Sequence, residues 1–411
     1  MSADEKIRDG RSTEFRENVG ATPRVPTLVP GSTSANSRHS WRNFVIKALY
    51  HSQAVNAMER VTRRWELRKE QSASWPRLRR RRAPQFAILC YHRIGIGGVP
   101  LYSELSSDVF ETQMRYVRNN YRIVSMDQLI AEMEHPESPE PAVAITFDDG
   151  YSGLYEEAFP ILQRHAIPAT IFLTIGCIET GEVAWYDRVF VALKFMPGNT
   201  LELLLDRPRT FLLDSEAQRM SAATEIILCL RRFSSTRRKE CCADLESRSH
   251  LPEDELQGRM LTWDQIRIMY QGGVSFGAHT MSHPVVSQLS SSELEWEIFE
   301  SKRILEERLG CHVQHFAFPF GKSHECGESA TAVLTAAGFV SAATTEWGIN
   351  SVGSDPFKLR RVQTGEMESL ATFAFQLSRE FLRYNVDQFP PSSQNSVASD
   401  VPVRDQNWTM R

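Results

Sequence analysis

The sequence of 411 residues predicts an α/β protein built on a parallel sheet or barrel. Two observations carry this prediction. Short apolar runs bounded by turn residues recur from residue 84 to residue 343, and amphipathic helical stretches separate several of them. Such alternation is typical of βα units, whose strands lie parallel. The composition, 41% hydrophobic and 24% charged, is that of a globular chain and excludes a wholly disordered, collagen-like or disulfide-framed protein.

The apolar runs predict seven strands, and the periodic stretches predict helices between them. The expected strands are Phe86–Cys90, Tyr121–Val124, Val143–Phe147, Thr170–Thr174, Val274–Ala278, His315–Phe318 and Phe339–Ala343. The expected helices span 108–120, 126–134 and 291–309. The last is the clearest, because Ser290 and Glu293 form a capping box and Gly310 supplies a stop. Its apolar face consists of Leu294, Ile298, Leu305 and Leu309.

Residues 178–260 interrupt this rhythm. They are mostly of helical character, with Trp185–Phe195 and Ala217–Arg232 as the expected helices. We interpret them as an insertion over the mouth of the barrel, where loops carry substrate contacts.

Both ends of the chain lack the pattern of a packed domain. Residues 1–83 carry 18 Lys and Arg against 8 Asp and Glu, whereas the remainder carries 29 against 43. We expect 1–83 to be a basic, largely disordered extension with an amphipathic helix in 41–70, and 389–411 to be a disordered tail. The first interpretation of the basic cluster Arg77–Arg82 is a solvated linker, and the alternative is that 41–83 makes a peripheral contact with anionic membrane lipid. The acidic body argues against a nucleic-acid enzyme.

Targeting and thiol signals favour a cytoplasmic protein. No apolar run approaches the roughly 18 residues of a transmembrane helix, and the first residues lack the apolar core of a signal peptide. The seven cysteines are odd in number and irregularly spaced, as expected of reduced thiols.

Two adjacent carboxylates end an apolar run at residues 144–151 (AITFDDGY). Asp148 and Asp149 follow the expected strand directly, and active sites of βα folds lie at the carboxyl ends of strands. One of two neighbouring carboxylates can bind a metal while the other stays free as a base. Because Asp-Asp-Gly also occurs in turns, this motif alone leaves both interpretations open.

Two histidines four residues apart follow another apolar run at 276–284 (FGAHTMSHP). His279 and His283 can bind one ion if the chain turns after the strand, and Pro284 redirects the chain. With a carboxylate from the first motif they form a facial set of three ligands, leaving positions for water and substrate. We therefore predict a divalent metal site, with Zn²⁺ as the first expectation and Co²⁺, Ni²⁺ or Mn²⁺ as alternatives.

Two further strand ends carry weaker signals. The segment 315–322 (HFAFPFGK) indicates a strand followed by a Pro/Gly turn. The segment 88–94 (ILCYHRI) places His92 at the end of an apolar run, where a lone histidine is more often structural than catalytic.

Together the motifs resemble those of the NodB-homology polysaccharide deacetylases, carbohydrate esterase family 4. TFDDG at 146–150 and HTMSHP at 279–284 match the two signature motifs, and FAFPFG at 316–321 resembles the third. The resemblance covers roughly residues 84–385 outside the insertion, and we assign 84–388 to this domain. It implies a distorted (β/α)7-type barrel with the helical insertion, and metal-dependent hydrolysis of acetyl groups on sugars.

Matched residue by residue, the resemblance also implies roles. The metal ligands would be Asp149, His279 and His283. Asp148 would be the general base. Pro319 and Phe320 would border the acetyl pocket, with the Phe320 N–H as an oxyanion donor.

The chain departs from the family pattern twice. No arginine closely precedes Phe316 to tune the base, and the region 355–362 (DPFKLRRV) lacks the usual histidine acid. The segment 355–361 looks like the ending of exopolysaccharide-locus members. In a branch similar to the poly-N-acetylglucosamine deacetylases, an upstream YH motif supplies the acid, and Tyr91-His92 fits it. His92 then becomes the expected general acid, and Arg361 a candidate to replace the base-tuning arginine.

The function that follows is removal of N-acetyl groups from N-acetylglucosamine-type residues of an oligo- or polysaccharide. Chitin-type oligosaccharides, poly-N-acetylglucosamine and exopolysaccharide precursors all fit as substrates. Trp185 and Tyr186 of the insertion would suit stacking on sugar rings. One alternative is a hydrolase of a small non-sugar amide on the same barrel. Another is a non-catalytic carbohydrate-binding scaffold. The presence of Asp148 beside the ligand set Asp149, His279 and His283 argues against it, because a binding protein needs neither metal ligands nor an additional carboxylate.

Overall fold

The computed structural model describes residues 84–95, 104–365, 367 and 369–387. The predicted extension 1–83 and tail 389–411 lie outside these residues, and so does the segment 41–83 that was considered for lipid contact. These predictions, and the prediction of a cytoplasmic protein, stay predictions. Within the described ranges, no helix has the length and apolar character to cross a membrane. All seven cysteines lie in the described part of the chain, and none of them forms a disulfide there.

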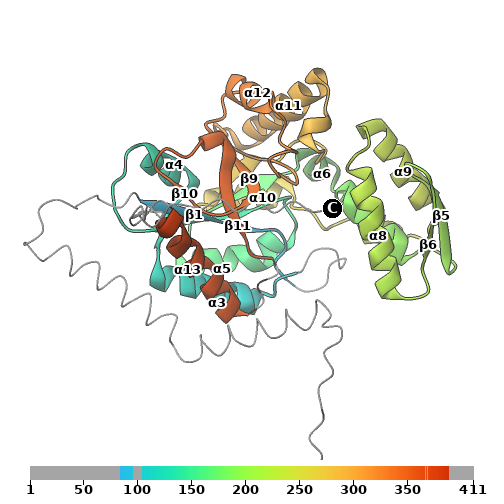
Figure 1. Ribbon diagram of the computed structural model, residues 1–411, viewed down its shortest axis with the longest axis horizontal. Helices are drawn as coiled ribbons and strands as arrows, with labels where there is room; N and C mark the ends of the chain where they lie inside the picture. The colour runs from blue at the N-terminus through green and yellow to red at the C-terminus, as the bar shows by residue number, and fades with distance from the viewer. Residues whose placement is uncertain (1–83, 96–103, 366, 368, 388–411) are drawn as a thin grey trace, which may run out of the picture. The chain divides into compact units, whose positions relative to one another are not determined.

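Seven parallel strands close into a barrel (Figure 1). They are β1 (Gln85–Tyr91), β3 (Ala142–Phe147), β4 (Ala169–Leu173), β7 (Ser275–Ala278), β8 (His315–Ala317), β9 (Ser341–Trp347) and β11 (Leu359–Gln363). Around the ring the order is β1-β11-β9-β8-β7-β4-β3, and the pairing of β3 with β1 closes it. β2 (Arg122–Ile123) extends the sheet beside β3, and β10 (Asn350–Ser351) pairs antiparallel with β1. The predicted distorted (β/α)7 barrel is confirmed.

Alternating residues of β1 and β3 enter two apolar clusters. Phe86 and Ile88 of β1 belong to a small cluster with residues of β3, β4, β8, β9 and β11, which marks the inside of the barrel, and Met126, Leu129 and Met133 pack into the same cluster. Ala87 and Leu89 belong to the larger cluster, to which the surrounding helices contribute. Every residue of β1 and β3 is buried, because parallel strands are covered on both faces.

Helices surround the barrel, and α3, α5 and α13 lie side by side (Figure 1). The α-helices outside the insertion are α3 (Ser107–Asn120), α4 (Met126–Glu134), α5 (Phe159–His165), α6 (Ile175–Thr180), α10 (Trp263–Gln271), α11 (Ser291–Leu309), α12 (Ala330–Ala336) and α13 (Leu370–Asp387). Short π or 3-10 turns are η1 (Leu154–Ala158), η2 (Glu253–Leu256), η3 (Val286–Gln288) and η4 (Pro356–Lys358). The three predicted helices 108–120, 126–134 and 291–309 are confirmed.

Helix α11 follows its sequence signals closely. Ser290 accepts from the Glu293 N–H and Glu293 bonds back to the Ser290 N–H, which completes the predicted capping box. Gly310 ends the helix at φ +68°, a conformation that glycine adopts at little cost.

The insertion contains a β-hairpin that the sequence analysis missed. Its helices are α7 (Trp185–Lys194), α8 (Glu216–Leu230) and α9 (Ser235–Arg248). Between α7 and α8, β5 (Thr200–Leu204) pairs antiparallel with β6 (Pro208–Leu212), and α8, α9 and the hairpin lie together in yellow-green in Figure 1. In β5, Leu201 and Leu203 are buried and alternate with exposed residues. Such a short leucine-rich run does not distinguish strand from helix by period alone.

Candidate active site

The carboxyl ends of the barrel strands bring the predicted catalytic residues together. His92 follows β1, Asp148 and Asp149 follow β3, and His279 follows β7. Because these strands are parallel, their ends meet at one edge of the barrel. Arg361, on β11, contacts Asp148 at the same place.

The three predicted metal ligands converge. The Asp149 Oδ1 atom lies 3.3 Å from His283 Nε2 and 3.6 Å from His279 Nε2. One ligand atom from each of the three buried residues lies within 4.8 Å of the others. This is the spacing that a single ion requires.

The chemistry of these groups fits a divalent metal. Asp149 Oδ1 is buried without a hydrogen-bond partner among the described residues. His279 Nδ1 lies 2.7 Å from the Ala317 carbonyl. A carbonyl only accepts, so this nitrogen carries the proton and the Nε2 lone pair faces Asp149. Zn²⁺ is bound by such carboxylate and imidazole atoms, and Co²⁺, Ni²⁺ and Mn²⁺ accept the same donors.

Electrostatics keep Asp149 and His279 in the forms that bind a metal. Burial lowers the pKa of His279 to about 4, which leaves the imidazole neutral near neutral pH. Burial alone would raise the pKa of Asp149, but the imidazoles of His283, His92 and His279 outweigh it and lower this pKa. An ionised carboxylate with neutral imidazoles is the protonation state in which metals bind.

Backbone strain is concentrated at the site. Among the described residues, five non-glycine residues have positive φ, and four of them are Asp149 (+73°), Thr280 (+67°), His283 (+53°) and Phe320 (+59°). Left-handed conformations of such residues cost free energy and persist where the surroundings impose them. No sequence signal predicted this feature.

Glu297 of α11 holds the loop that carries His283, a role that the sequence analysis missed. Its Oε2 atom accepts from the Met281 N–H at 2.7 Å and from the Ser282 N–H at 2.9 Å, and Oε1 accepts from the Ser282 hydroxyl. Burial raises the pKa of this carboxyl although these bonds oppose the shift. The available signal was a charged residue on the apolar stripe of α11, next to Ile298.

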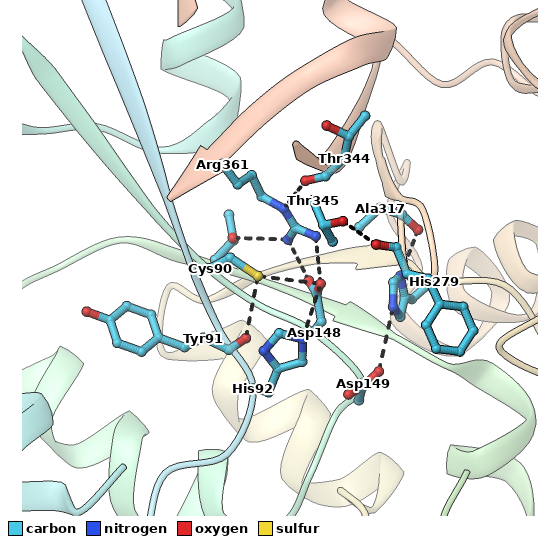
Figure 2. A network of polar contacts seen from close by, with 12 residues as sticks. Cys90, Tyr91, His92, Asp148, Asp149, His279, Ala317, Thr344, Thr345 and Arg361 are labelled. Carbon is cyan, nitrogen blue, oxygen red and sulfur yellow. Dashed lines mark hydrogen bonds and ion pairs between the residues drawn. The ribbon is translucent and has the colours of Figure 1, made fainter. Parts of the chain in front are cut away.

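Asp148 is bound by a buried arginine. Arg361 Nη1 and Nη2 lie 2.7 Å from Asp148 Oδ1 and Oδ2 respectively, and Arg361 is fully buried (Figure 2). Its Nε donates to the Thr344 carbonyl at 2.8 Å. Burial alone would raise the pKa of Asp148, but Arg361 and His279 outweigh it and lower this pKa. The carboxylate therefore stays ionised at neutral pH.

His92 lies on the other side of Asp148 (Figure 2). Its Nε2 is 3.9 Å from Asp148 Oδ2, and its side chain is 29% exposed whereas the Asp148 side chain is 2% exposed. Cys90, which the sequence analysis left without a role, places its Sγ 3.6 Å from the same oxygen. Of these three side chains, His92 is the one that solvent reaches.

Aromatic side chains surround His283. The ring of Phe320 lies 4.8 Å from the His283 ring, and the Arg231 guanidinium lies 4.1 Å over the Phe320 ring. Pro319, which precedes Phe320, is buried. Tyr186 also lies 4.8 Å from the His283 ring, but it is only 1% exposed. The expectation that Tyr186 stacks on sugar is therefore wrong, because its ring is packed inside the wall of the site.

The fold and this arrangement define a hydrolase of the NodB-homology barrel class. The family model for polysaccharide deacetylase matches residues 135–340, half of the chain. The chain belongs to the polysaccharide deacetylase family, and the resemblance seen in its sequence is confirmed. The matched region contains both signature motifs, whereas His92 and Arg361 lie outside it.

Individual relatives are distant. The YxkH protein of Bacillus subtilis is 20% identical over 308 residues, which cover 74% of this chain and 80% of YxkH. A poly-β-1,6-N-acetyl-D-glucosamine N-deacetylase of Staphylococcus aureus is 30% identical over 91 residues, 22% of this chain and 31% of that enzyme. The deacetylase PplD of Streptococcus pyogenes aligns with 72% of this chain and 98% of its own, with 19% identity and a TM-score of 0.49. IcaB of Ammonifex degensii aligns with 72% of this chain and 96% of its own, with 19% identity and a TM-score of 0.46.

Proposed function

We propose that this deacetylase removes N-acetyl groups from N-acetylglucosamine-type residues of an oligo- or polysaccharide, using a bound divalent metal. One observation carries the proposal: two adjacent carboxylates have different partners. Asp149 directs one oxygen, which accepts no hydrogen bond among the described residues, toward His279 and His283, while Asp148 is paired with Arg361. The Staphylococcus aureus relative, which acts on a polymer of N-acetylglucosamine by its name, supports the choice of sugar.

The metal would be held by Asp149, His279 and His283. When bound, a divalent ion supplies Lewis acidity toward the amide carbonyl and toward water. Zn²⁺ is the ion we propose, because carboxylate and imidazole donors with open positions are typical of catalytic zinc.

Asp148 is suited to act as the general base. Its carboxylate is kept ionised by Arg361, so it can accept a proton from the attacking water over a wide pH range. Arg361 also fixes the orientation of the carboxylate, because the two parallel bonds define the plane of the group. In this proposal Arg361 replaces the base-tuning arginine that the third motif lacks.

Pro319 and Phe320 would border the acetyl pocket. The Phe320 ring packs against the ligand His283, and the positive φ of Phe320 orients the peptide bond that precedes it. We propose that the N–H of Phe320 donates a hydrogen bond to the oxyanion formed when water attacks the acetyl carbon.

His92 is proposed as the general acid, and its replacement by alanine should lower kcat by about 10²–10⁴-fold. Its imidazolium would protonate the departing amine, so the alkaline limb of the pH–rate profile should disappear in the variant. Steady-state kinetics across pH 5–10 would measure both effects. The control is His312→Ala, since the His312 side chain is 96% exposed and no site residue contacts it among the described residues. An unchanged pH–rate profile in His92→Ala would remove His92 from this role.

Acetate release tests the proposed function. The metal-loaded protein is incubated with β-1,4-linked and β-1,6-linked oligomers of N-acetylglucosamine of two to six sugars, with N-acetylglucosamine itself, and with a small cyclic imide. We expect acetate from at least one oligomer series, loss of activity with a chelator, and recovery with Zn²⁺. Hydrolysis of the imide opens its ring and releases no acetate, so this substrate is followed by chromatography of the ring-opened product. Turnover of the imide alone would favour the small-amide alternative, and no turnover of any compound would contradict the proposal.

A further inference from the structure

The first turn of α7 contacts the rim of the proposed active site. The Trp185 Nε1–H donates to the His283 carbonyl at 3.0 Å. The Tyr186 ring lies 4.8 Å from the His283 ring, and both aromatic rings face Phe320 at 6.1 and 6.3 Å. The insertion therefore forms part of the wall of the site.

Asp187 is the next residue of this turn, and it is fully buried. Its Oδ2 atom accepts two hydrogen bonds, one from Arg93 Nη2 at 2.6 Å and one from the Tyr151 hydroxyl at 2.8 Å. The Arg93 guanidinium also lies 4.0 Å over the Tyr151 ring. One carboxylate thus joins two segments that are far apart in the sequence.

The two segments are those that carry the proposed acid and base. Arg93 directly follows His92, and Tyr151 follows Asp148 and Asp149 after one glycine. The Tyr151 hydroxyl also lies 3.3 Å from that of Tyr186. A shift of Asp187 would therefore affect both the segment of His92 and the segment of Asp148 and Asp149.

We infer that Asp187 is a positioning residue, through which the insertion holds the His92 and Asp148–Asp149 segments in their reactive arrangement. The inference rests on the proposed function for its consequence in catalysis. The contacts themselves do not depend on which acetylated compound is the substrate.

A purely stabilising role explains these contacts less well. A buried ion pair contributes little net stability compared with apolar side chains of similar volume. The Asp187 Oδ1 atom is also buried without a hydrogen-bond partner among the described residues, which is a cost to folding. What the ion pair supplies instead is a fixed geometry between Arg93, Tyr151 and α7.

The experiment compares Asp187→Asn with Glu246→Gln in the full-length, metal-loaded protein. Glu246 of α9 accepts hydrogen bonds from Nε and Nη2 of Arg188 at 2.6 and 2.7 Å, and Arg188 lies in α7 beside Asp187. Replacement of Glu246 therefore breaks a different ion pair of α7, the one that connects α7 with α9. A third variant, Arg93→Met with Asp187→Leu, removes both charges without leaving one of them buried alone. Thermal melts establish that each variant is folded.

The first measurement is hydrogen exchange, which does not depend on activity. We expect exchange in peptides covering 91–95 and 148–153 to become at least tenfold faster in Asp187→Asn and in the apolar pair, and to stay unchanged in Glu246→Gln. Equal protection of these peptides in all variants would overturn the inference.

The second measurement is acetate release from the oligomer that the wild type deacetylates best. We expect kcat to fall about 10–100-fold in Asp187→Asn and in the apolar pair, with KM within about threefold of wild type. If the apolar pair recovers both thermal stability and kcat, Asp187 has only a structural role. If the wild type releases no acetate, the proposed function fails, while hydrogen exchange still decides whether Asp187 holds the two segments.

Discussion

Asparagine in place of Asp148 should lower kcat by about 10²–10⁴-fold while the protein keeps its metal. The amide has the shape of the carboxylate but cannot accept the proton of the attacking water. The metal ligands are untouched, since Asp148 is paired with Arg361 rather than with His279 or His283. Steady-state kinetics and metal analysis of the same preparation would measure both quantities.

The matched control is Cys90→Ala. Its thiol lies 3.6 Å from the Asp148 carboxylate, so the substitution perturbs the same surroundings without removing a proton acceptor. We expect its kcat to stay within about fivefold of wild type. A metal-loaded Asp148→Asn protein with the kcat of the wild type would exclude Asp148 as the base.

Asp148→Asn should also destabilise the fold, because it leaves the Arg361 guanidinium buried without its counter-charge. Loss of one partner of a buried ion pair costs about 3–5 kcal/mol. Kinetics should therefore be measured well below the melting temperature of the variant. A fall in kcat that persists there is separable from a fall in the folded fraction.

The barrel could be predicted from the sequence because its strands are buried on both faces. Continuous apolar runs such as those of β1 and β3, when helical stretches separate them, are typical of the strands of a parallel sheet. The strand β11 was not predicted, because Leu359–Gln363 carries two arginines and one of them lies inside the barrel. Buried charge hides a strand from any criterion based on hydrophobicity.

The candidate site residues could be predicted because each follows a strand directly and lies in a motif that resembles those of the family. Parallel strands place Asp148, Asp149 and His279 at one edge of the barrel. The role proposed for each residue came from the family resemblance. The ion pair of Arg361 with Asp148 joins residues 213 positions apart, so the sequence supported it only as a candidate. The barrel makes them neighbours because β11 packs between β1 and β9.

The supporting residues could not be predicted, because their partners are backbone groups or come from the insertion. Glu297 binds two peptide N–H groups whose direction depends on the left-handed turn at Thr280. Asp187 meets Arg93 and Tyr151 only where α7 reaches the barrel. A sequence motif does not indicate such contacts, because any side chain of suitable length and charge could make them.

Addition of Zn²⁺ should raise the melting temperature of the wild type by a few degrees and leave that of Asp149→Asn unchanged. An ion that binds only the folded state adds about 2.7 kcal/mol at a concentration one hundred times its Kd. In the folded chain, the Asp149 carboxylate and two imidazoles converge, and one buried oxygen of Asp149 accepts no hydrogen bond among the described residues. A bound ion would contact this oxygen. Acetate release by Asp149→Asn should fall to the blank at the same time.

The control for this shift is Asp127→Asn, which breaks a second aspartate–histidine pair. Asp127 Oδ1 lies 2.8 Å from His315 Nε2, at the first residue of β8. If zinc acts at the proposed ligands, Asp127→Asn keeps the full shift in melting temperature. A shift that survives in Asp149→Asn would place the ion elsewhere. Because melting requires no substrate, this result decides where the metal binds even before the sugar is known.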